Sequence, residues 1–264
     1  MDAREWLGLE PTHNPNRWFL PVTPGISTPG NFLFGGCGLG AAISALEGTT
    51  GRPLIWATAQ YLSYAQPPSI VDIDVPVVVP GNQVSQARAI AKVGDTEILT
   101  VNAALGARQL DAEGEWSQRP AVLAPDECPP RANHRHMEGD WIMSRLEERV
   151  ALPADGSKPD ATTNGRSALW VRMPAGIDMG PAALGVLGDF VPGGVGAALG
   201  RNGGGNSLDN TIRIARPVPT DWVLLDIRIH AIANGFAHGL VHQWAEDGTL
   251  LATASQSTIV RLRD

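Results

Sequence analysis

Cysteine and lysine are scarce in this 264-residue sequence, and each scarcity excludes a class of protein. The two cysteines, Cys37 and Cys128, are too few for a disulfide framework or a four-thiolate zinc site. Lys92 and Lys158 are the only lysines, the formal net charge is −7, and no basic cluster is present that could follow a nucleic-acid backbone. We therefore expect neither a disulfide-stabilised protein nor a nucleic-acid-binding protein.

Long uninterrupted apolar runs are also missing. The longest apolar stretches are broken by Gly, Pro or Asp, which argues against a membrane span. The first residues, "MDAREWLGLE", are acidic and lack an apolar core, so no signal peptide is expected. With 43% hydrophobic and 18% charged residues, the chain can bury a sizeable core. These features predict a soluble, cytoplasmic, folded protein.

Pro-rich and polar segments divide the chain into two parts. They lie within residues 114–166, on either side of one weakly helical or extended piece, "DWIMSRLEERV". This composition is typical of a linker. It predicts one domain over residues 1–113, a linker over 114–166 and a second domain over 167–264. The length of the chain suits two domains of about 120 residues each.

The two predicted domains show the same order of patterns. Each starts with a short strand, "NRWFLPV" or "SALWVRMP", and continues through a turn into a helix of small residues, "GCGLGAAISALEGT" or "MGPAALGVLGDFV". Further strands follow in each, and a hairpin with "GD" or "DG" closes the last pair. This is an internal repeat of about 150 residues. A small-residue helix wrapped by a long antiparallel sheet is the hotdog arrangement, so we predict an α+β double hotdog.

The repeats differ in the polar residues that their strands carry. A shift of about 150 residues places Asp209 opposite Ala59 and Gln256 opposite Ala104. The same shift places His230 opposite a run of three valines. The second repeat is therefore predicted to hold a site, and the first to serve as its scaffold.

Asp209 follows a run of glycines in "GGGNSLDNTIRIARP", in what is predicted to be a strand. A buried carboxylate there is costly unless something uses or satisfies it. As a general base it would orient a water molecule and take its proton. The Gln256 amide would donate to the water or to the carboxylate, and His230 could do either. Such a trio suits addition of water to an activated carbonyl. The alternative is that Asp209 only accepts a backbone hydrogen bond after the glycine loop.

These residues lie in segments that resemble the type II acyl-CoA thioesterases, double-hotdog enzymes that hydrolyse fatty acyl-CoA. "FLFGGCGLGAA" resembles the start of the family's first central helix, "YLSYAQP" its strand-to-turn segment, and "GNQVSQARA" its Gly-x-Ser-Phe-x-x-Arg stretch. "NSLDNTIRIARP" resembles the strand that carries the family's active-site aspartate, and "DGTLLATASQ" the last hairpin with its glutamine. The resemblance rests on the order of these short motifs over most of the chain.

The resemblance implies roles for individual residues. Asp209 and Gln256 match the family's water-activating acid and amide, and His230 stands where the family has a threonine. A cytoplasmic acyl-CoA hydrolase of fatty acid metabolism is implied, with acyl-CoA as substrate, no metal or redox cofactor, and a homodimeric assembly.

The resemblance also implies how the thioester is polarised. Its carbonyl would point at the N-terminus of the first central helix, where Gly35, Gly36 and Cys37 would bind the developing oxyanion. Cys37 replaces the family's usual glutamine there. Glu47 and Asp189, late in the two helices, are expected to mark helix ends.

Three alternatives stay open. The departures at Cys37 and His230 favour a non-catalytic protein that binds acyl-CoA or an acyl-carrier protein. Hydration of enoyl thioesters would need an Asp-x-Asn-Pro-x-His pattern, and "THNPNRW" has Asn-Pro without the acid and the histidine. The "HRH" at residues 134–136 could hold a metal, although two histidines in a loop are weak evidence.

Overall fold

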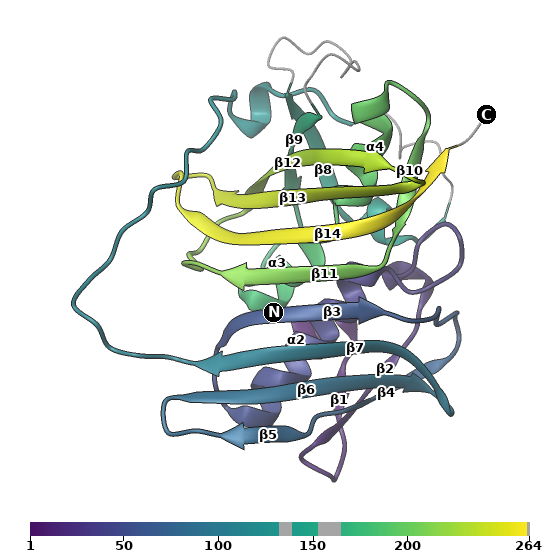
Figure 1. The fold of residues 1–264 in the computed structure, drawn as a ribbon, viewed down its shortest axis with the longest axis vertical. Helices are drawn as coiled ribbons and strands as arrows, with labels where there is room; N and C mark the ends of the chain where they lie inside the picture. The colour runs from purple at the N-terminus through teal and green to yellow at the C-terminus, as the bar shows by residue number, and fades with distance from the viewer. Residues whose placement is uncertain (132–138, 153–164, 263–264) are drawn as a thin grey trace.

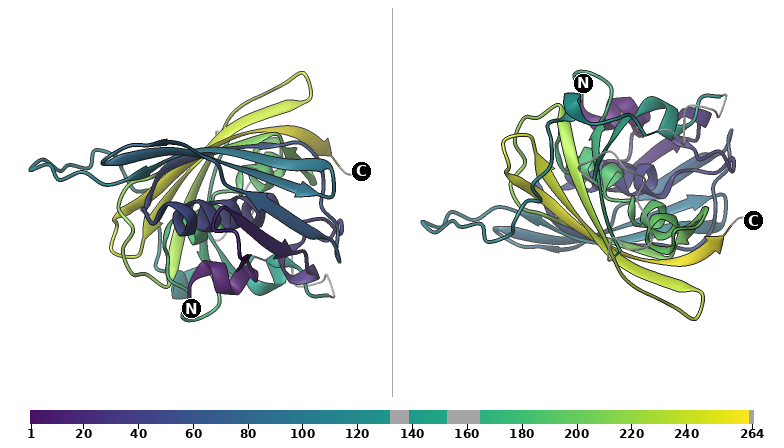
Figure 2. Two further views of the ribbon diagram at one scale, coloured as in Figure 1. Left: turned by 90° about the horizontal axis from the view of Figure 1, so that it is seen from below. Right: turned by 90° about the horizontal axis from the view of Figure 1, so that it is seen from above.

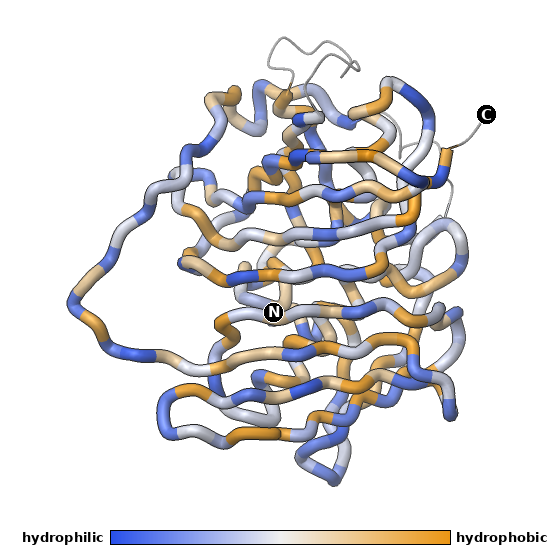
Figure 3. Tube along the Cα trace, viewed as in Figure 1, coloured by the Kyte–Doolittle hydropathy of each residue, from blue (hydrophilic) through white to orange (hydrophobic). Residues whose placement is uncertain are grey.

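In the computed structural model, which describes residues 1–131, 139–152 and 165–262, the strands form one continuous antiparallel sheet. The first half of the chain, purple to teal in Figure 1, lies below the second half, green to yellow. The sheet curves around the helices, which lie on one side of it (Figure 2). Apolar and polar residues alternate along many strands (Figure 3), as expected for a sheet with one buried face.

The first repeat has a short helix, a long central helix and several strands. Its strands pair in the order β2-β4-β6-β7-β3, with β1 beside β2 and β5 beside β6. The elements are α1 (Ala3–Leu7), β1 (Glu10–Pro11), β2 (Arg17–Pro21), η1 (Pro24–Ile26), α2 (Gly35–Thr50), β3 (Leu54–Tyr61), β4 (Ile70–Asp74), β5 (Val77–Pro80), β6 (Val84–Val93) and β7 (Thr96–Gly106).

The second repeat pairs its strands in the order β9-β12-β13-β14-β11, with β8 beside β9 and β10 beside β14. In both repeats the spatial order is first, third, fourth, fifth and second strand, which confirms the predicted double hotdog. The elements are η2 (Pro125–Glu127), η4 (Ile142–Arg145), β8 (Glu147–Leu152), β9 (Arg166–Arg172), α3 (Pro181–Leu187), α4 (Val191–Leu199), β10 (Gly203–Ser207), β11 (Asp209–Ile214), β12 (Trp222–Ala233), β13 (Phe236–Ala245) and β14 (Leu250–Leu262).

The repeats meet where β3 pairs with β11, at the middle of the sheet (Figure 1). Thr58 faces Thr211 across this seam, and their hydroxyl oxygens lie 3.1 Å apart. Each threonine occupies the equivalent place in its repeat. The Thr58–Thr211 pair therefore serves as the reference from which equivalent positions of the two repeats are counted.

The central helices pack very closely, because glycines lie where they touch. A methyl group on Gly40 of α2 would come within 2.8 Å of the Ala182 carbonyl oxygen of α3. One on Gly185 of α3 would come within 2.7 Å of Ile43. Glycine disfavours a helix interior, so α2 owes its stability to this burial rather than to intrinsic propensity.

The segment Pro181–Leu199, which contains α3 and α4, is long and apolar enough to cross a membrane, with a mean hydropathy of 1.5. Yet 72% of this stretch is buried inside the fold. Its fully buried residues include Leu184, Leu187 and Val195, which belong to the main core. The length and apolar character of the stretch are those of a core helix.

The chain that follows β7 first runs away from the sheet and then reaches the second repeat (Figure 1). Part of the predicted linker, Glu147–Leu152, forms β8 and pairs with β9. The indole nitrogen of Trp170 in β9 donates to the Leu123 carbonyl, 3.0 Å away. The chain around Leu123 therefore packs against a second cluster of buried residues, which contains three tryptophans. Arg131 and Met143, which also lie between β7 and β9 in the sequence, line the cavity described below.

We expect Gly40→Ala to lower the free energy of unfolding by about 1–3 kcal/mol, because its methyl group would overpack the helix contact. Gly38→Ala, two residues earlier in α2, is the matched control. Its methyl group would make ordinary contacts, 3.4 Å from Leu99 and 3.5 Å from Leu33, and it should be neutral or stabilising. Urea denaturation of the two variants checks this, and equal losses would contradict the close helix contact.

Candidate active site

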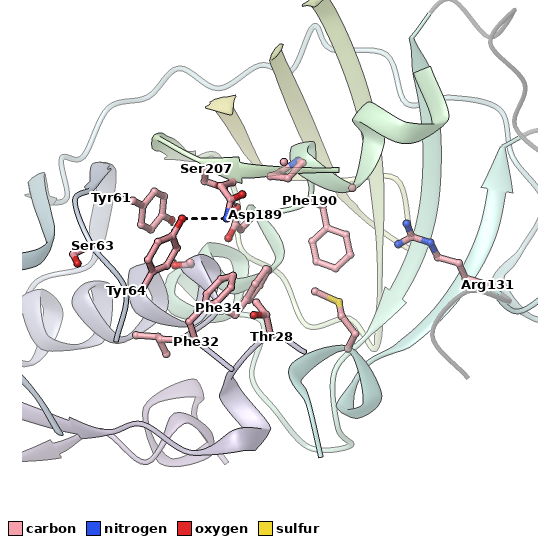
Figure 4. Close-up of a pocket in the computed structure, with 17 residues that line it drawn as sticks. Thr28, Phe32, Phe34, Tyr61, Ser63, Tyr64, Arg131, Asp189, Phe190 and Ser207 are labelled. Carbon is pink, nitrogen blue, oxygen red and sulfur yellow. Dashed lines mark hydrogen bonds between the residues drawn. The ribbon is translucent and has the colours of Figure 1, made fainter. Parts of the chain in front are cut away.

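A cavity of about 220 Å³ lies between the start of α2 and the second repeat. Figure 4 shows side chains of both repeats around it. The chain has two tyrosines, Tyr61 and Tyr64, and both line it. Most of the remaining wall is apolar. The other lining residues are Thr28, Phe32, Leu33, Phe34, Gly35, Ser63, Arg131, Met143, Asp189, Phe190, Pro192, Gly193, Gly205, Asn206 and Ser207.

Asp189 lies in the break between α3 and α4 and is the acidic residue of the cavity wall. It is 6% exposed. One carboxylate oxygen, Oδ2, accepts a hydrogen bond from the backbone N–H of Gly36, 2.8 Å away. The other, Oδ1, accepts from the Ser207 hydroxyl at 2.8 Å and from the Gln256 amide at 2.5 Å. Three donors thus fix the carboxylate, and both repeats contribute.

Burial raises the pKa of the Asp189 carboxyl to about 6. The hydrogen bonds from Gln256, Ser207 and Gly36 act in the opposite direction, since they favour the charged form. The net result is a carboxylate that is largely ionised at neutral pH and yet more basic than an ordinary aspartate. Such a pKa suits a general base.

The Gln256 side chain is anchored at both ends of its amide. Its oxygen accepts a hydrogen bond from the backbone N–H of Val191, the first residue of α4, at 3.3 Å. Its nitrogen donates to the Ser207 hydroxyl at 3.1 Å as well as to Asp189. The amide is 3% exposed, so its orientation is fixed by these contacts. The structure therefore pairs the Gln256 amide with Asp189, and not with Asp209, the acid that the sequence analysis placed beside it.

The glycines at the start of α2 allow the helix to approach Asp189. A methyl group on Gly35 would lie 2.5 Å from Asp189 Oδ2, and one on Gly36 would collide with the Val186 carbonyl oxygen. Gly35 lines the cavity, and its carbonyl accepts a hydrogen bond from the Tyr61 hydroxyl at 3.1 Å. The N–H of Gly36, predicted to face the substrate, donates to Asp189 instead.

Cys37 is fully buried within α2 and is absent from the cavity wall. Burial raises the pKa of its thiol well above the usual value, and the nearby Asp189 adds to the effect. The thiol is therefore protonated at neutral pH.

Asp209 lies on the outer face of the sheet. It pairs with exposed Gln60, whereas the next pair along, Asn210 and Ala59, is fully buried. Because successive side chains of a strand point to opposite faces, the Asp209 carboxylate points away from the helices. It accepts a hydrogen bond from the backbone N–H of Ser257 at 2.7 Å. This is the backbone-satisfying arrangement left open above.

A β-bulge separates Ser207 from Asp209. Ser207 pairs with Thr258 and Thr211 pairs with Ser255, so three residues on one strand oppose two on the other. Without the extra residue, Ser207 and Asp209 would share a face. With it, Ser207 turns inward to the cavity and Asp209 outward.

His230 is exposed and lies at another irregularity, where the pairing of β12 with β13 shifts between Ile229 and Ala231. It is absent from the cavity wall. The structure therefore does not bring His230 together with Gln256, and Ser207 provides the hydroxyl beside the acid.

The first repeat lacks an equivalent set of polar groups. Through the threonine pair at the seam and the strand pairings, Gln256 corresponds to Ala103 and Ser207 to Leu54. Ala103 is 1% exposed and Leu54 4% exposed. The polar side chains around the acid thus come from the second repeat. Of the three polar residues that the comparison of the repeats singled out, Gln256 belongs to this cluster, whereas Asp209 and His230 do not.

Asp189 and Ser207 were missed in the sequence, although each left a signal. Asp189 is the one charged residue in the apolar stretch 179–200, and a lone charge among buried residues needs a function or partners. Ser207 lies two residues before Asp209, in the segment that resembles the family's active-site strand. The "HRH" at 134–136 lies outside the described residues.

Comparisons with known proteins agree with this architecture. The family model described as acyl-CoA thioesterase C-terminal domain matches residues 125–260. A candidate thioesterase from Novosphingobium aromaticivorans superimposes with a TM-score of 0.87 at 31% identity, covering 97% of this chain and 98% of that one. No curated protein sequence matches the chain.

Two more distant solved structures share the fold. A hot dog protein of unknown function from Alicyclobacillus acidocaldarius has a TM-score of 0.86 at 18% identity, with 99% and 98% of the chains covered. An acyl-CoA thioesterase II from Mycobacterium marinum has a TM-score of 0.78 at 19% identity, with 99% of each chain covered.

The raised pKa of Asp189 makes stability depend on pH. Its usual pKa is 3.8, and the folded value is about 6. The folded state therefore binds more protons than the unfolded state between these values, so stability falls as pH rises through this range. The loss is on the order of 3 kcal/mol. Denaturation at several pH values should show this slope in the wild type and its disappearance in Asp189→Asn. An identical slope in both would contradict the raised pKa.

Proposed function

The chain belongs to the acyl-CoA thioesterase family, and from this premise we propose that it hydrolyses acyl-CoA thioesters to the free acid and coenzyme A. The reaction would take place at the cluster of Asp189, Ser207 and Gln256. One observation carries the proposal: a buried carboxylate with a pKa of about 6 faces an apolar cavity beside the N-terminus of a helix.

Asp189 acts as the general base. A water molecule bound to its carboxylate attacks the thioester carbonyl carbon, and Asp189 takes the proton as the new C–O bond forms. The tetrahedral intermediate then expels the thiolate of coenzyme A, and the C–S bond breaks. The proton on Asp189 passes to the departing thiolate, which restores the carboxylate. Ser207 and Gln256 hold Asp189 and orient the water.

The first turn of α2 stabilises the oxyanion. This turn reaches the cavity at Gly35, where the helix dipole and free backbone N–H groups favour negative charge. Tyr61 fixes the same turn through its bond to the Gly35 carbonyl. The Gly36 N–H serves the acid and not the oxyanion.

The proposal keeps Gln256 from the sequence prediction and replaces Asp209 and His230 with Asp189 and Ser207. Its support is the contacts of each residue: Asp189 and Ser207 line the cavity, whereas Asp209 lies on the outer face of the sheet and accepts a hydrogen bond from the backbone N–H of Ser257. The alternative remains a non-catalytic protein that binds acyl-CoA in the same cavity.

Replacing Asp189 with Asn removes the base but keeps its size, so we expect hydrolysis to fall by roughly 10²–10⁴-fold. Asp209→Asn is the matched control and should keep activity within a few fold, because its carboxylate accepts a hydrogen bond from the Ser257 N–H and does not line the cavity. The measurement is release of free thiol from acyl-CoA esters of short to long chains. In the wild type, kcat/KM should rise with pH through an ionisation near 6.

Each outcome of this experiment has a distinct meaning. Loss of activity in Asp209→Asn with normal activity in Asp189→Asn would restore the sequence prediction and overturn the assignment of Asp189. Saturable binding of acyl-CoA without thiol release from any ester would make the protein a binder. Thermal denaturation of both variants establishes that they are folded.

A further inference from the structure

The cavity has two different ends, with Asp189 between them. At one end Tyr64 is 58% exposed, packs against the tilted ring of Phe32 with the ring centroids 4.9 Å apart, and accepts a hydrogen bond from Asn206. This exposed end is close to the reacting groups and is the natural entrance for the thiol part of a thioester. The acyl group would then extend in the other direction, towards Arg131.

Arg131 directs its guanidinium into the cavity from the other end (Figure 4). In the view of Figure 4 the ring of Phe190 lies between Arg131 and Asp189. Met143 also lines the cavity. Apolar side chains thus line the cavity between the acid and the guanidinium, and Arg131 lies at its far end.

The position of Arg131 is fixed by Glu148 of β8. The guanidinium nitrogen Nη1 donates to Glu148 Oε2 at 2.6 Å, and the Arg131 backbone N–H donates to the Glu148 carbonyl at 2.9 Å. The side chain of Glu148 is 5% exposed and that of Arg131 22% exposed. Glu148 is not part of the cavity wall, so the cavity meets only the guanidinium of this pair.

The charges select a neutral acceptor over an anion. Arg131 and Glu148 together carry no net charge, and Asp189 adds a negative charge to the cavity once it is ionised. A second carboxylate would therefore be repelled, whereas a hydroxyl or carbonyl oxygen can accept a charge-assisted hydrogen bond from the guanidinium. An alkyl end would leave those donors desolvated without a partner.

The size of the cavity limits the acyl group. A methylene occupies about the volume of a liquid water molecule, about 30 Å³. A cavity of about 220 Å³ therefore holds roughly seven such groups in all. A chain that runs from Asp189 to Arg131 occupies only part of this volume, so its length is at most about seven such groups.

We propose that Arg131 forms a subsite for a neutral oxygen at the distal end of the acyl group. The preferred substrates are then medium-length acyl-CoA esters that end in a hydroxyl or carbonyl group. This inference rests on the proposed hydrolysis and specifies its substrate class.

The test compares ω-hydroxyhexanoyl-CoA with heptanoyl-CoA, which has a methyl group of nearly the same size in place of the hydroxyl. We expect kcat/KM of the wild type to be roughly tenfold higher for the hydroxylated ester. Arg131→Met alone would strand the buried Glu148, so the test variant is the double variant Arg131→Met/Glu148→Gln. It should lose the preference for the hydroxyl while still hydrolysing heptanoyl-CoA.

Glu148→Gln alone is the matched control. It keeps the guanidinium and its hydrogen bond, so the preference for the hydroxyl should persist. Because it removes the neutralising charge, it should also raise kcat/KM for adipoyl-CoA, whose chain ends in a carboxylate, relative to heptanoyl-CoA. No such rise would contradict the charge argument and overturn the preference for a neutral oxygen.

Two outcomes separate the subsite from the hydrolysis. Equal hydrolysis of both esters by the wild type, or a uniform loss on both in the double variant, would overturn the subsite and leave the thioesterase function intact. Binding of the corresponding thioether analogues, which cannot be hydrolysed, is measured in parallel. If no ester is hydrolysed but the hydroxylated analogue binds more tightly only when Arg131 is present, the subsite stands and the hydrolysis does not.

Discussion

The hydrogen bond from the Gly36 N–H to Asp189 joins the two repeats at their chemical centre. It exists because α2 and α3 touch through glycines, which lets the first turn of one helix reach the end of the other. The contact buries the acid, which raises its pKa, and also supplies one of the donors that hold it in place. The position of the Asp189 carboxylate, its raised pKa and its closeness to the N-terminus of α2 all follow from one close helix contact.

The architecture could be predicted from the sequence because it is repeated. A strand, a helix of small residues and a set of hairpins occur twice in the same order, and each copy supports the interpretation of the other. The inward orientation of Gln256 was also predictable, since burial alternates regularly along β14 around it. The comparison of the repeats also indicated that the polar side chains of the strands lie in the second repeat.

The identity of the acid could not be predicted in the same way. The family-like strand contains both Ser207 and Asp209, and regular alternation would present the two together. A single extra residue in the pairing with β14 turns one inward and the other outward. Bulges depend on tertiary pairing and leave little trace in a short sequence pattern. Asp189 was likewise hidden, because the break between α3 and α4 turns an expected helix end into a cavity wall.

The two repeats contribute unequally to the cluster around Asp189, because the first repeat has the apolar residues Leu54 and Ala103 where the second has Ser207 and Gln256. The first repeat supplies Asp189 with a backbone donor, which every residue type except proline possesses. At Gly35 and Gly36 the first repeat needs residues without a side chain, because a methyl group at either position would collide with the second repeat. The first repeat is thus constrained by steric limits, and the second by the hydrogen-bonding groups of its side chains. A substitution in the first repeat is therefore limited by the space it needs, and one in the second by the hydrogen bonds it keeps.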